Sequence, residues 1–335
     1  MKKLQKLTLI IILTLILALM AVILISRLCY KRTLQATIAE LYLKLTVKHV
    51  TGEEMERGLL ELKARKEQPY LLPADTQVEG GITSENFENM PVMYLNKEGK
   101  GKLILYLHGG SYLHHPDPHH YKFLSRLIKK TDARVILPVY PKTPWHDFTE
   151  AYDLVSKLYE KISREEDIIL MGDSAGGGLA LGVAQYFHTL ELKEPLGIIT
   201  FSPWLDLTME NPAIKEYEKV DPWLRLASSL PIAKSWANGT ELTDYRISPT
   251  FGDLQGLNNV TVFVGTREIL YPDIIKFTEK MKQKNMDFQL FIGEGLNHVY
   301  PLFPIPEGAE AIAELVKILE ELEADAAAAK CLLRK

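Results

Sequence analysis

A serine between glycines directly follows a run of apolar residues that predicts a buried strand. Residues 168–171 are Ile-Ile-Leu-Met, Gly-Asp-Ser-Ala-Gly spans 172–176, and an alanine- and leucine-rich stretch that predicts a helix follows. Glycines around Ser174 permit a turn too tight for larger side chains, and this turn leaves the hydroxyl above the edge of the sheet. The pattern predicts a nucleophilic serine, and it matches neither of the glycine-rich phosphate-loop patterns.

A second glycine motif follows an upstream strand. His108, Gly109 and Gly110 come directly after the apolar residues 103–107. Successive glycines expose backbone N–H groups, which an acyl-transfer site needs for its developing oxyanion. We expect the N–H groups of Gly109, Gly110 and Ala175, the residue after the serine, to form this oxyanion hole. His108 is expected to support the loop rather than carry a proton.

A carboxylate and an imidazole each follow a later predicted strand. Glu268 comes just after residues 260–265, and His298 comes shortly after residues 288–292. With Ser174 they give the chain order serine, acid, histidine, which is the order of α/β-hydrolases and not that of the chymotrypsin or subtilisin types. The sequence therefore predicts a Ser-Glu-His triad.

The chain as a whole alternates short β-rich runs with longer amphipathic stretches. This alternation predicts a mostly parallel sheet covered by helices on both faces, an α/β fold. The predicted strands are 92–95, 103–107, 134–139, 168–171, 197–201, 260–265 and 288–292. Between the predicted strands 197–201 and 260–265, residues 205–248 contain Trp223 and Trp236 and no strand pattern. This segment is therefore predicted to be an inserted helical cap. The tryptophans near this cap fit packing on the sheet and contact with a substrate equally well.

Five motifs together resemble the hormone-sensitive-lipase-like branch of the α/β-hydrolases. The resemblance covers roughly residues 85–322 and lies in His-Gly-Gly at 108–110, Gly-Asp-Ser-Ala-Gly-Gly at 172–177, Ser-Pro-Trp-Leu-Asp-Leu at 202–207, Glu-x-Leu at 268–270 and Gly-x-x-His at 295–298. It implies an α/β-hydrolase fold and cofactor-free hydrolysis of a small or amphiphilic acyl ester. In that mechanism Ser174 attacks, His298 takes its proton, and Glu268 orients the imidazole.

This chain departs from the family pattern at three places. Ser111 stands where a third glycine is often found, Glu268 stands where aspartate is commoner, and Pro272-Asp273 replaces Asp-Glu. Asp273 is therefore the alternative triad acid. The motifs also leave the reaction class open, since an amidase, formamidase or deacetylase would use the same triad. A non-catalytic ligand-binding homologue is the alternative from another class of protein.

The first part of the chain differs sharply in composition. Nineteen residues from Leu7 to Ile25 contain only two polar side chains, both threonine, and as a helix they would span about 30 Å, the thickness of a bilayer core. The run is long for a signal peptide and no small-x-small cleavage site follows it. We therefore predict a single-pass anchor at 1–26. Basic residues flank both ends of this run, so the positive-inside rule gives only a weak indication of its orientation. An extracytoplasmic hydrolase domain is favoured.

A helical linker or cap segment is predicted at 27–84, ahead of the hydrolase domain at 85–335. Leu34, Ile38, Leu41 and Leu45 recur at helical spacing, and Thr51 begins a capping box for a second helix that extends to about residue 66. These helices are expected either to pack on the main domain or to form a lid between it and the membrane.

Composition and the remaining motifs exclude several functions. The 39 basic and 43 acidic residues give a net charge of −4, which removes the main electrostatic term of nucleic-acid binding. Cys29 and Cys331 lie at opposite ends, which excludes a disulfide scaffold.

Histidines crowd residues 114–120, but adjacent histidines in a loop point apart, so we expect a loop with Asp117 as a helix N-cap and no metal. Tyr112 is expected to line the substrate pocket. Oligomeric state is not predicted.

Overall fold

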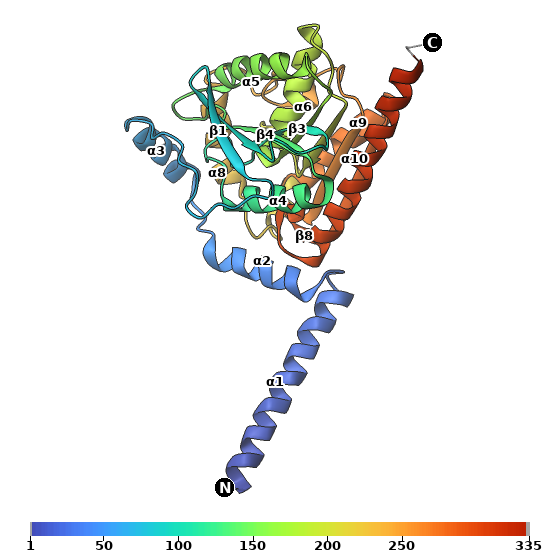
Figure 1. Ribbon diagram of the computed structural model, residues 1–335. Coiled ribbons are helices and arrows are strands. Elements are labelled where there is room, and N and C mark those ends of the chain that lie inside the picture. Colours follow the sequence, from blue (N-terminus) through green and yellow to red (C-terminus); the bar gives the residue numbers. More distant parts are fainter. Residues whose placement is uncertain (1, 333–335) are drawn as a thin grey trace.

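The computed structural model describes residues 2–332, and its centre is one eight-stranded sheet (Figure 1). The strand order is β1-β2-β4-β3-β5-β6-β7-β8. From β4 to β8 all neighbours are parallel, whereas β2 runs antiparallel to both β1 and β4. The strands are β1 (Ile82–Phe87), β2 (Met90–Leu95), β3 (Leu103–Leu107), β4 (Arg134–Pro138), β5 (Ile168–Asp173), β6 (Gly197–Phe201), β7 (Val260–Arg267) and β8 (Phe288–Asn297).

Helices cover both faces of the sheet. Side chains alternate across β3, so that Leu105 packs into one core with α5, α6 and α9, while Tyr106 packs into the other with α4 and α10. The predicted fold class is confirmed. The helices are α1 (Lys2–Leu28), α2 (Leu34–Thr46), α3 (Gly52–Lys63), α4 (Pro118–Thr131), α5 (Phe148–Ser163), α6 (Ser174–Thr189), α7 (Ile214–Glu218), α8 (Leu226–Ala237), α9 (Tyr271–Gln283) and α10 (Pro306–Leu332), with 3₁₀ turns η1 (Pro249–Phe251) and η2 (Tyr300–Leu302).

All seven predicted strands are present, and one strand was not predicted. The missed strand, β1, lies at the edge of the sheet and pairs only with β2, and its four central residues are exposed. Because it buries little on either face, it lacks the apolar pattern on which strand prediction rests. The strands β7 and β8 extend beyond the predicted ends, continuing past a bulge between Gly265 and Arg267 up to the edge of the candidate site.

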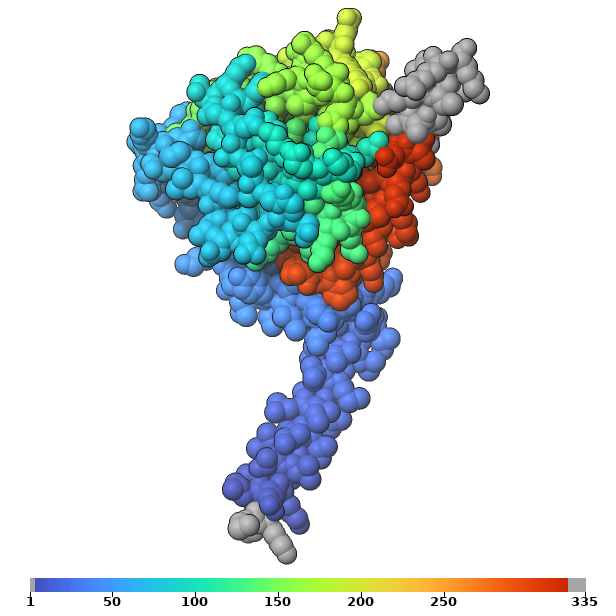
Figure 2. Space-filling view, in the orientation of Figure 1, coloured from blue at the N-terminus to red at the C-terminus, as the bar shows by residue number. Residues whose placement is uncertain are grey.

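The N-terminal helices lie outside the sheet layers. Figure 1 shows α1 projecting away from the body, with α2 lying crosswise between α1 and the body. The space-filling view shows α1 as an isolated rod (Figure 2).

The predicted capping box at Thr51 is confirmed at the start of α3. The predicted cap segment 205–248 contains α7 and α8 and, within the described chain, no strand. Cys29 is a free, exposed cysteine, and the side chain of Cys331 lies outside the described residues.

Candidate active site

Ser174 occupies a sharp turn between β5 and α6. Its φ of +52° lies in the left-handed region, which is strained for a residue other than glycine. The turn presses against the neighbouring loop after β3: a Cβ on Gly176 would lie 2.1 Å from the carbonyl oxygen of Leu107. Glycine is therefore required at 176, and the strained turn holds the Ser174 hydroxyl at the carboxyl edge of the sheet.

Three strand ends bring Ser174, His298 and Glu268 together. The Ser174 Oγ lies 2.9 Å from Nε2 of His298, whose Nδ1 forms a short hydrogen bond with Oε2 of Glu268. The other carboxylate oxygen of Glu268 accepts hydrogen bonds from Oγ of Ser202, at 2.6 Å, and from the backbone N–H of Gly265, at 2.9 Å. Glu268 is fully buried, so both of its oxygens are held in fixed directions.

Ser202 is a part of the site that was predicted only as a member of a family motif. Its hydroxyl donates to Glu268 and accepts the backbone N–H of Val299, at 2.9 Å. It therefore links the acid to the residue next to His298. The sequence signal was its position directly after β6, where the next strand end of a parallel sheet must lie beside the others.

The surroundings of His298 favour its protonated form. Burial alone lowers the pKa of His298, but the charge and hydrogen bond of Glu268, with a further contribution from the Asp221 carboxylate, raise it above the ordinary value. Trp223, half-buried in the cap segment, packs its ring edge-on to His298 at a centroid distance of 5.7 Å. His298 thus lies between the carboxylates of Glu268 and Asp221, which favour its protonated form, and the ring of Trp223, which packs against it.

The alternative acid, Asp273, points elsewhere. It lies in the first turn of α9, and its carboxylate accepts a hydrogen bond from Nδ2 of Asn211 at 2.7 Å. Burial raises the pKa of Asp273 to about 6. Of the two candidate carboxylates, Glu268 is the one that contacts His298.

The prediction that the backbone N–H of Gly109 belongs to the oxyanion hole is wrong. Its backbone N–H already donates to Oδ1 of Asp173, at 2.9 Å, and is not free for an oxyanion. A Cβ at 109 would clash with the same carboxylate. The loop instead turns at Gly110 and Ser111, whose φ angles are +116° and +55°. The N–H of Ala175 belongs to the first turn of α6, where helix N–H groups have no partner within the helix.

Asp173 is the anchor of this loop, and sequence reasoning gave it no role. Besides Gly109, it accepts the hydroxyl of Tyr106 at 2.7 Å, and Nε2 of His120 lies 3.4 Å away. Burial lowers the pKa of His120, but the Asp173 and Asp117 carboxylates raise it to about 10. The position of Asp173 directly before the nucleophile could be read from the sequence. Its contacts with Tyr106, Gly109 and His120 depend on the fold and could not.

His108 supports the loop. Its Nδ1 donates to the Gly109 carbonyl oxygen at 2.7 Å, and its ring stacks on Tyr140 at 4.5 Å. Burial lowers the pKa of His108 far below its ordinary value, so the ring stays neutral.

Tyr112 is enclosed by aromatic side chains. Its ring stacks on Trp236 at a centroid distance of 4.3 Å and on Trp204 at 5.9 Å, and all three are buried. Two of the tryptophans are therefore packing residues, and Trp223 is the one beside the site. Contact between Tyr112 and a substrate stays a prediction.

The histidine-rich loop ends in a helix cap, as predicted. Asp117 caps α4 by accepting the N–H groups of His119 and His120. Among the side chains that the structure describes, no cluster of three or more His, Cys, Asp or Glu is arranged to hold a metal ion.

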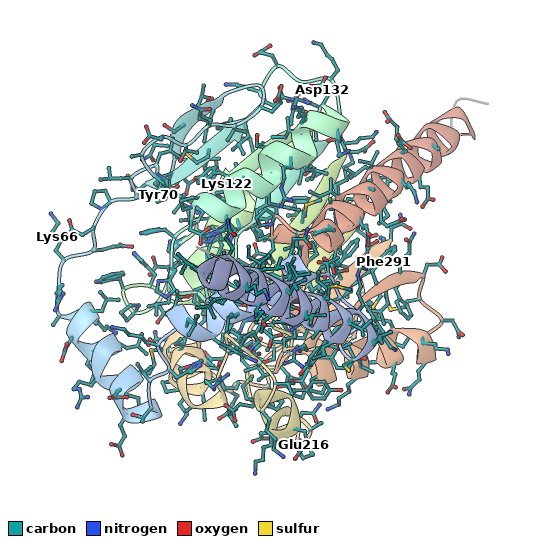
Figure 3. The ribbon with its side chains drawn as sticks, turned by 90° about the horizontal axis from the view of Figure 1, so that it is seen from below. Lys66, Tyr70, Lys122, Asp132, Glu216 and Phe291 are labelled. Carbon is teal, nitrogen blue, oxygen red and sulfur yellow. The ribbon has the colours of Figure 1, made fainter. Side chains whose placement is uncertain are left out.

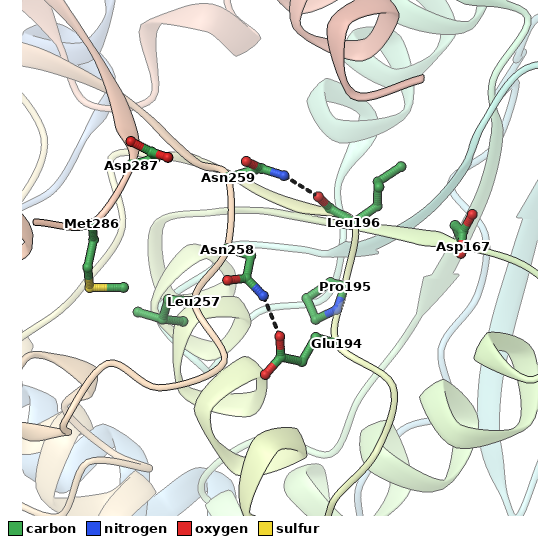
Figure 4. Close-up of a pocket in the computed structure, with 9 residues that line it drawn as sticks. All are labelled: Asp167, Glu194, Pro195, Leu196, Leu257, Asn258, Asn259, Met286 and Asp287. Carbon is green, nitrogen blue, oxygen red and sulfur yellow. Dashed lines mark hydrogen bonds between the residues drawn. The ribbon is translucent and has the colours of Figure 1, made fainter. Parts of the chain in front are cut away.

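A cavity of about 500 Å³ lies at the amino edge of the sheet, where β6 and β7 begin (Figure 4). Asn259 donates across it to the Leu196 carbonyl at 2.9 Å, and Asn258 donates to Glu194. Because Ser174 follows the carboxyl end of β5, this cavity is at the opposite edge from the candidate site.

Known proteins are similar to this chain over the region that carries the site. A protein family described by its alpha/beta hydrolase fold matches residues 104–302. An esterase of Acinetobacter venetianus is 30% identical over 231 residues, which are 67% of this chain and 76% of that protein. An acetyl-hydrolase of Streptomyces hygroscopicus is 28% identical, over 63% of this chain and 73% of its own. A solved esterase/lipase from an uncultured bacterium superposes with a TM-score of 0.73 at 26% identity, over 87% of this chain and 99% of its own.

Proposed function

The chain belongs to the alpha/beta hydrolase fold family, and from this premise we propose that it hydrolyses carboxylic esters with Ser174, His298 and Glu268 as its catalytic triad. Its similarity to esterases makes it a carboxylesterase-like hydrolase. The observation that carries the finer proposal is the 2.9 Å contact between Ser174 Oγ and His298 Nε2, with Glu268 on the other ring nitrogen.

Acylation begins when Ser174 Oγ attacks the ester carbonyl carbon and His298 Nε2 accepts the hydroxyl proton. Glu268 holds Nδ1–H, which leaves Nε2 free to act as the base, and its charge stabilises the imidazolium that forms. The N–H groups of Gly110, Ser111 and Ala175 stabilise the carbonyl oxygen as it becomes negative. His298 then protonates the leaving alkoxide, and an acyl-serine remains.

Deacylation repeats these steps with water. His298 takes a proton from the water, whose oxygen attacks the acyl carbon, and the second tetrahedral intermediate uses the same three N–H groups. The proton returns to Ser174 Oγ as the ester bond breaks, so the carboxylic acid leaves and the free enzyme is restored. The nucleophile, the base and the oxyanion donors proposed for this cycle all belong to the chain.

Small or amphiphilic acyl esters are the proposed substrates. The acetyl-hydrolase among the relatives supports including acetyl esters in this range. The triad geometry suits an amide carbonyl as well, so an amide with the same acyl group, such as p-nitroacetanilide beside p-nitrophenyl acetate, separates the two reactions.

We also propose that α1 anchors the protein in a membrane as a single uncleaved span. The stretch Leu4–Leu28 has 25 residues and a mean hydropathy of 3.2 in its most apolar part, and none of that part is buried by the rest of the chain. A cleaved signal sequence is the competing account. Carbonate extraction of membranes should leave the full-length protein in the pellet, and release of the protein, or an intact mass without α1, would contradict the anchor.

The triad is tested with full-length protein in detergent on p-nitrophenyl acetate, butyrate and octanoate. Ser174→Ala should abolish turnover, and Glu268→Gln should lower it by up to about 10⁴-fold because the imidazole loses its orientation and charge partner. Asp273→Asn is the matched control, a buried carboxylate five positions away that should keep turnover within about threefold. Turnover that survives Ser174→Ala, or an equal loss in Asp273→Asn, would refute the assignment.

A further inference from the structure

Helix α2 presents an apolar stripe that nothing in the described chain covers. Ile38, Leu41, Tyr42 and Leu45 are 56%, 53%, 64% and 77% exposed. They follow one another at intervals of three, one and three residues, which places them together along one side of the helix. We call these four residues the outer stripe. Large apolar side chains gathered in water mark a binding surface.

The opposite side of α2 faces the body of the protein. Ala36, Glu40 and Leu43 are its buried residues, and on a helix of 3.6 residues per turn they lie about 180° from the outer stripe. Glu40 accepts hydrogen bonds from Arg267, at the end of β7, and from Arg32. The helix is therefore held firmly on one side, so the outer stripe cannot turn inward.

The junction of α1 and α2 is also held. The backbone N–H of Arg32 donates to the carbonyl of Ser26 at 3.1 Å, and the hydroxyl of Thr37 donates to Ser26 Oγ at 2.8 Å. This elbow sets α2 across the end of α1 (Figure 1). Seen from below, α1 projects over the middle of the body rather than its margin (Figure 3).

These observations fix where the outer stripe lies relative to a membrane crossed by α1. If α1 spans the bilayer, as proposed above, a helix crosswise to its end lies along the bilayer surface. Because the inner side of α2 is occupied by the body, the outer stripe faces the lipid. Lys31 and Lys44, both exposed, lie just before α2 and near its end, and basic side chains favour the interfacial region.

We propose that α2 is an interfacial helix, with the outer stripe inserted at the boundary between lipid headgroups and acyl chains. The occupant of this surface is thus a phospholipid bilayer. This inference rests on the proposed anchoring by α1 and adds a second contact with the membrane, which holds the hydrolase domain against the surface rather than free on a tether.

The experiment measures the depth of the outer stripe in full-length protein reconstituted in phosphatidylcholine vesicles. In a Cys29→Ser, Cys331→Ser background, an environment-sensitive NBD fluorophore is attached at Leu45→Cys. The matched control is Leu190→Cys, another exposed leucine, which follows α6 at the amino edge of the sheet, away from α2. Nitroxide-labelled lipids quench the fluorophore only at short range, and labels in the upper or lower acyl chain report its depth.

We expect the probe at 45 to lose emission, more with the upper-chain nitroxide than with the lower, and the probe at 190 to keep it. Unchanged emission at 45 with both lipids would overturn the proposal. Emission at 45 that ignores nitroxide but varies with the protein-to-lipid ratio would also overturn it, because a second copy would then cover the stripe.

Two controls keep the result separate from the anchor and from misfolding. Carbonate extraction of the same vesicles tests α1: release of protein that is nevertheless quenched at 45 refutes the anchor and leaves the interfacial helix standing. Both labelled proteins should hydrolyse p-nitrophenyl butyrate like the parent, which shows that they are folded. Ile38→Cys repeats the measurement at another position of the stripe and must agree with Leu45→Cys.

Discussion

At the scale of single residues, Asp221 connects the cap segment to the acid of the candidate triad. Its carboxylate accepts the backbone N–H groups of Trp223, Leu224 and Ile269 at 2.7 to 2.9 Å. Ile269 directly follows Glu268. The buried Asp221 carboxylate therefore joins the backbone of the cap segment to the backbone next to the acid. Burial raises the pKa of Asp221 to about 6, and above that pH its negative charge helps to stabilise protonated His298.

This charge predicts a pH dependence for catalysis. His298 must be neutral to act as a base, and its pKa is raised, so kcat/KM should fall with acid on a limb centred above the ordinary histidine value of 6.5. Asp221→Asn removes one of the charges that raise this pKa, and the limb should move to lower pH. The measurement is kcat/KM for p-nitrophenyl butyrate across the pH range in which the variant stays folded.

Asp253→Asn, which changes an exposed carboxylate, is the control and should leave the limb in place. An Asp221→Asn enzyme with an unmoved limb but reduced turnover would show that Asp221 acts only by holding the backbone.

The predictability of the site follows from how its residues are placed. Ser174, Glu268 and His298 each come shortly after a strand, and the strands of a parallel sheet end at one edge, so their meeting could be predicted from order and spacing. The engagement of Gly109 by Asp173 could not, because it depends on how closely two loops approach. Asp221 lies in the cap, whose path has no repeating pattern to follow.

At the scale of elements, helix caps are features that local sequence specifies well. Asp147 caps α5, accepting the N–H of Thr149 at 2.8 Å. Asp147→Ala should lower the free energy of unfolding by about 1 kcal/mol, within a range of about 0.5–2. Asp153→Ala on the same helix removes only an exposed ion pair with Lys157 and should change it by less than about 0.5 kcal/mol. Chemical denaturation of both variants makes the comparison, and equal losses would argue against the cap.

Strands were predictable in proportion to how much they bury. The five residues of β3 are all buried, as are those of β6, and such continuous apolar runs are typical of parallel strands covered on both faces. The edge strand β1 buries almost nothing and has no such run. The ends of β7 and β8 were missed because Gly265 and Gly293 interrupt the pattern, although pairing continues beyond them.

At the scale of the molecule, a buried ion cluster joins the N-terminal segment to the hydrolase body. Arg32 and Arg267 both contact Glu40, and Arg32 also donates to the carbonyl of Gly295 at 2.7 Å. Removing one member of a buried pair leaves the others uncompensated, which costs about 3–5 kcal/mol. Glu40→Gln should therefore lower thermal stability markedly in detergent at neutral pH, and a change within experimental error would contradict this account.

The same cluster predicts a pH dependence of stability. Burial would raise the pKa of Glu40, but its hydrogen bonds with Arg32, Arg267 and Lys44 outweigh this and lower it from 4.5 to about 2. A lowered pKa contributes stability that is complete above pH 4.5 and is lost as the pH falls toward 2. The stability difference between the parent and Glu40→Gln, measured by unfolding at a series of pH values, should therefore shrink across this window. A difference that stays constant would exclude this linkage.

The contacts of the N-terminal segment also set the timing of folding during synthesis. Glu40 must wait for Arg267, 227 residues later, and Arg32 must wait for Gly295, 263 residues later. At a translation rate of about 5–20 residues per second, this delay is roughly 10–50 s. For that interval Arg32, Glu40 and Lys44 can pair only with one another, because their partners in the body have not yet been made. Native docking of α2 is thus among the last events in the making of this protein, and a nascent chain stalled before residue 267 would expose it to proteases that the finished protein resists.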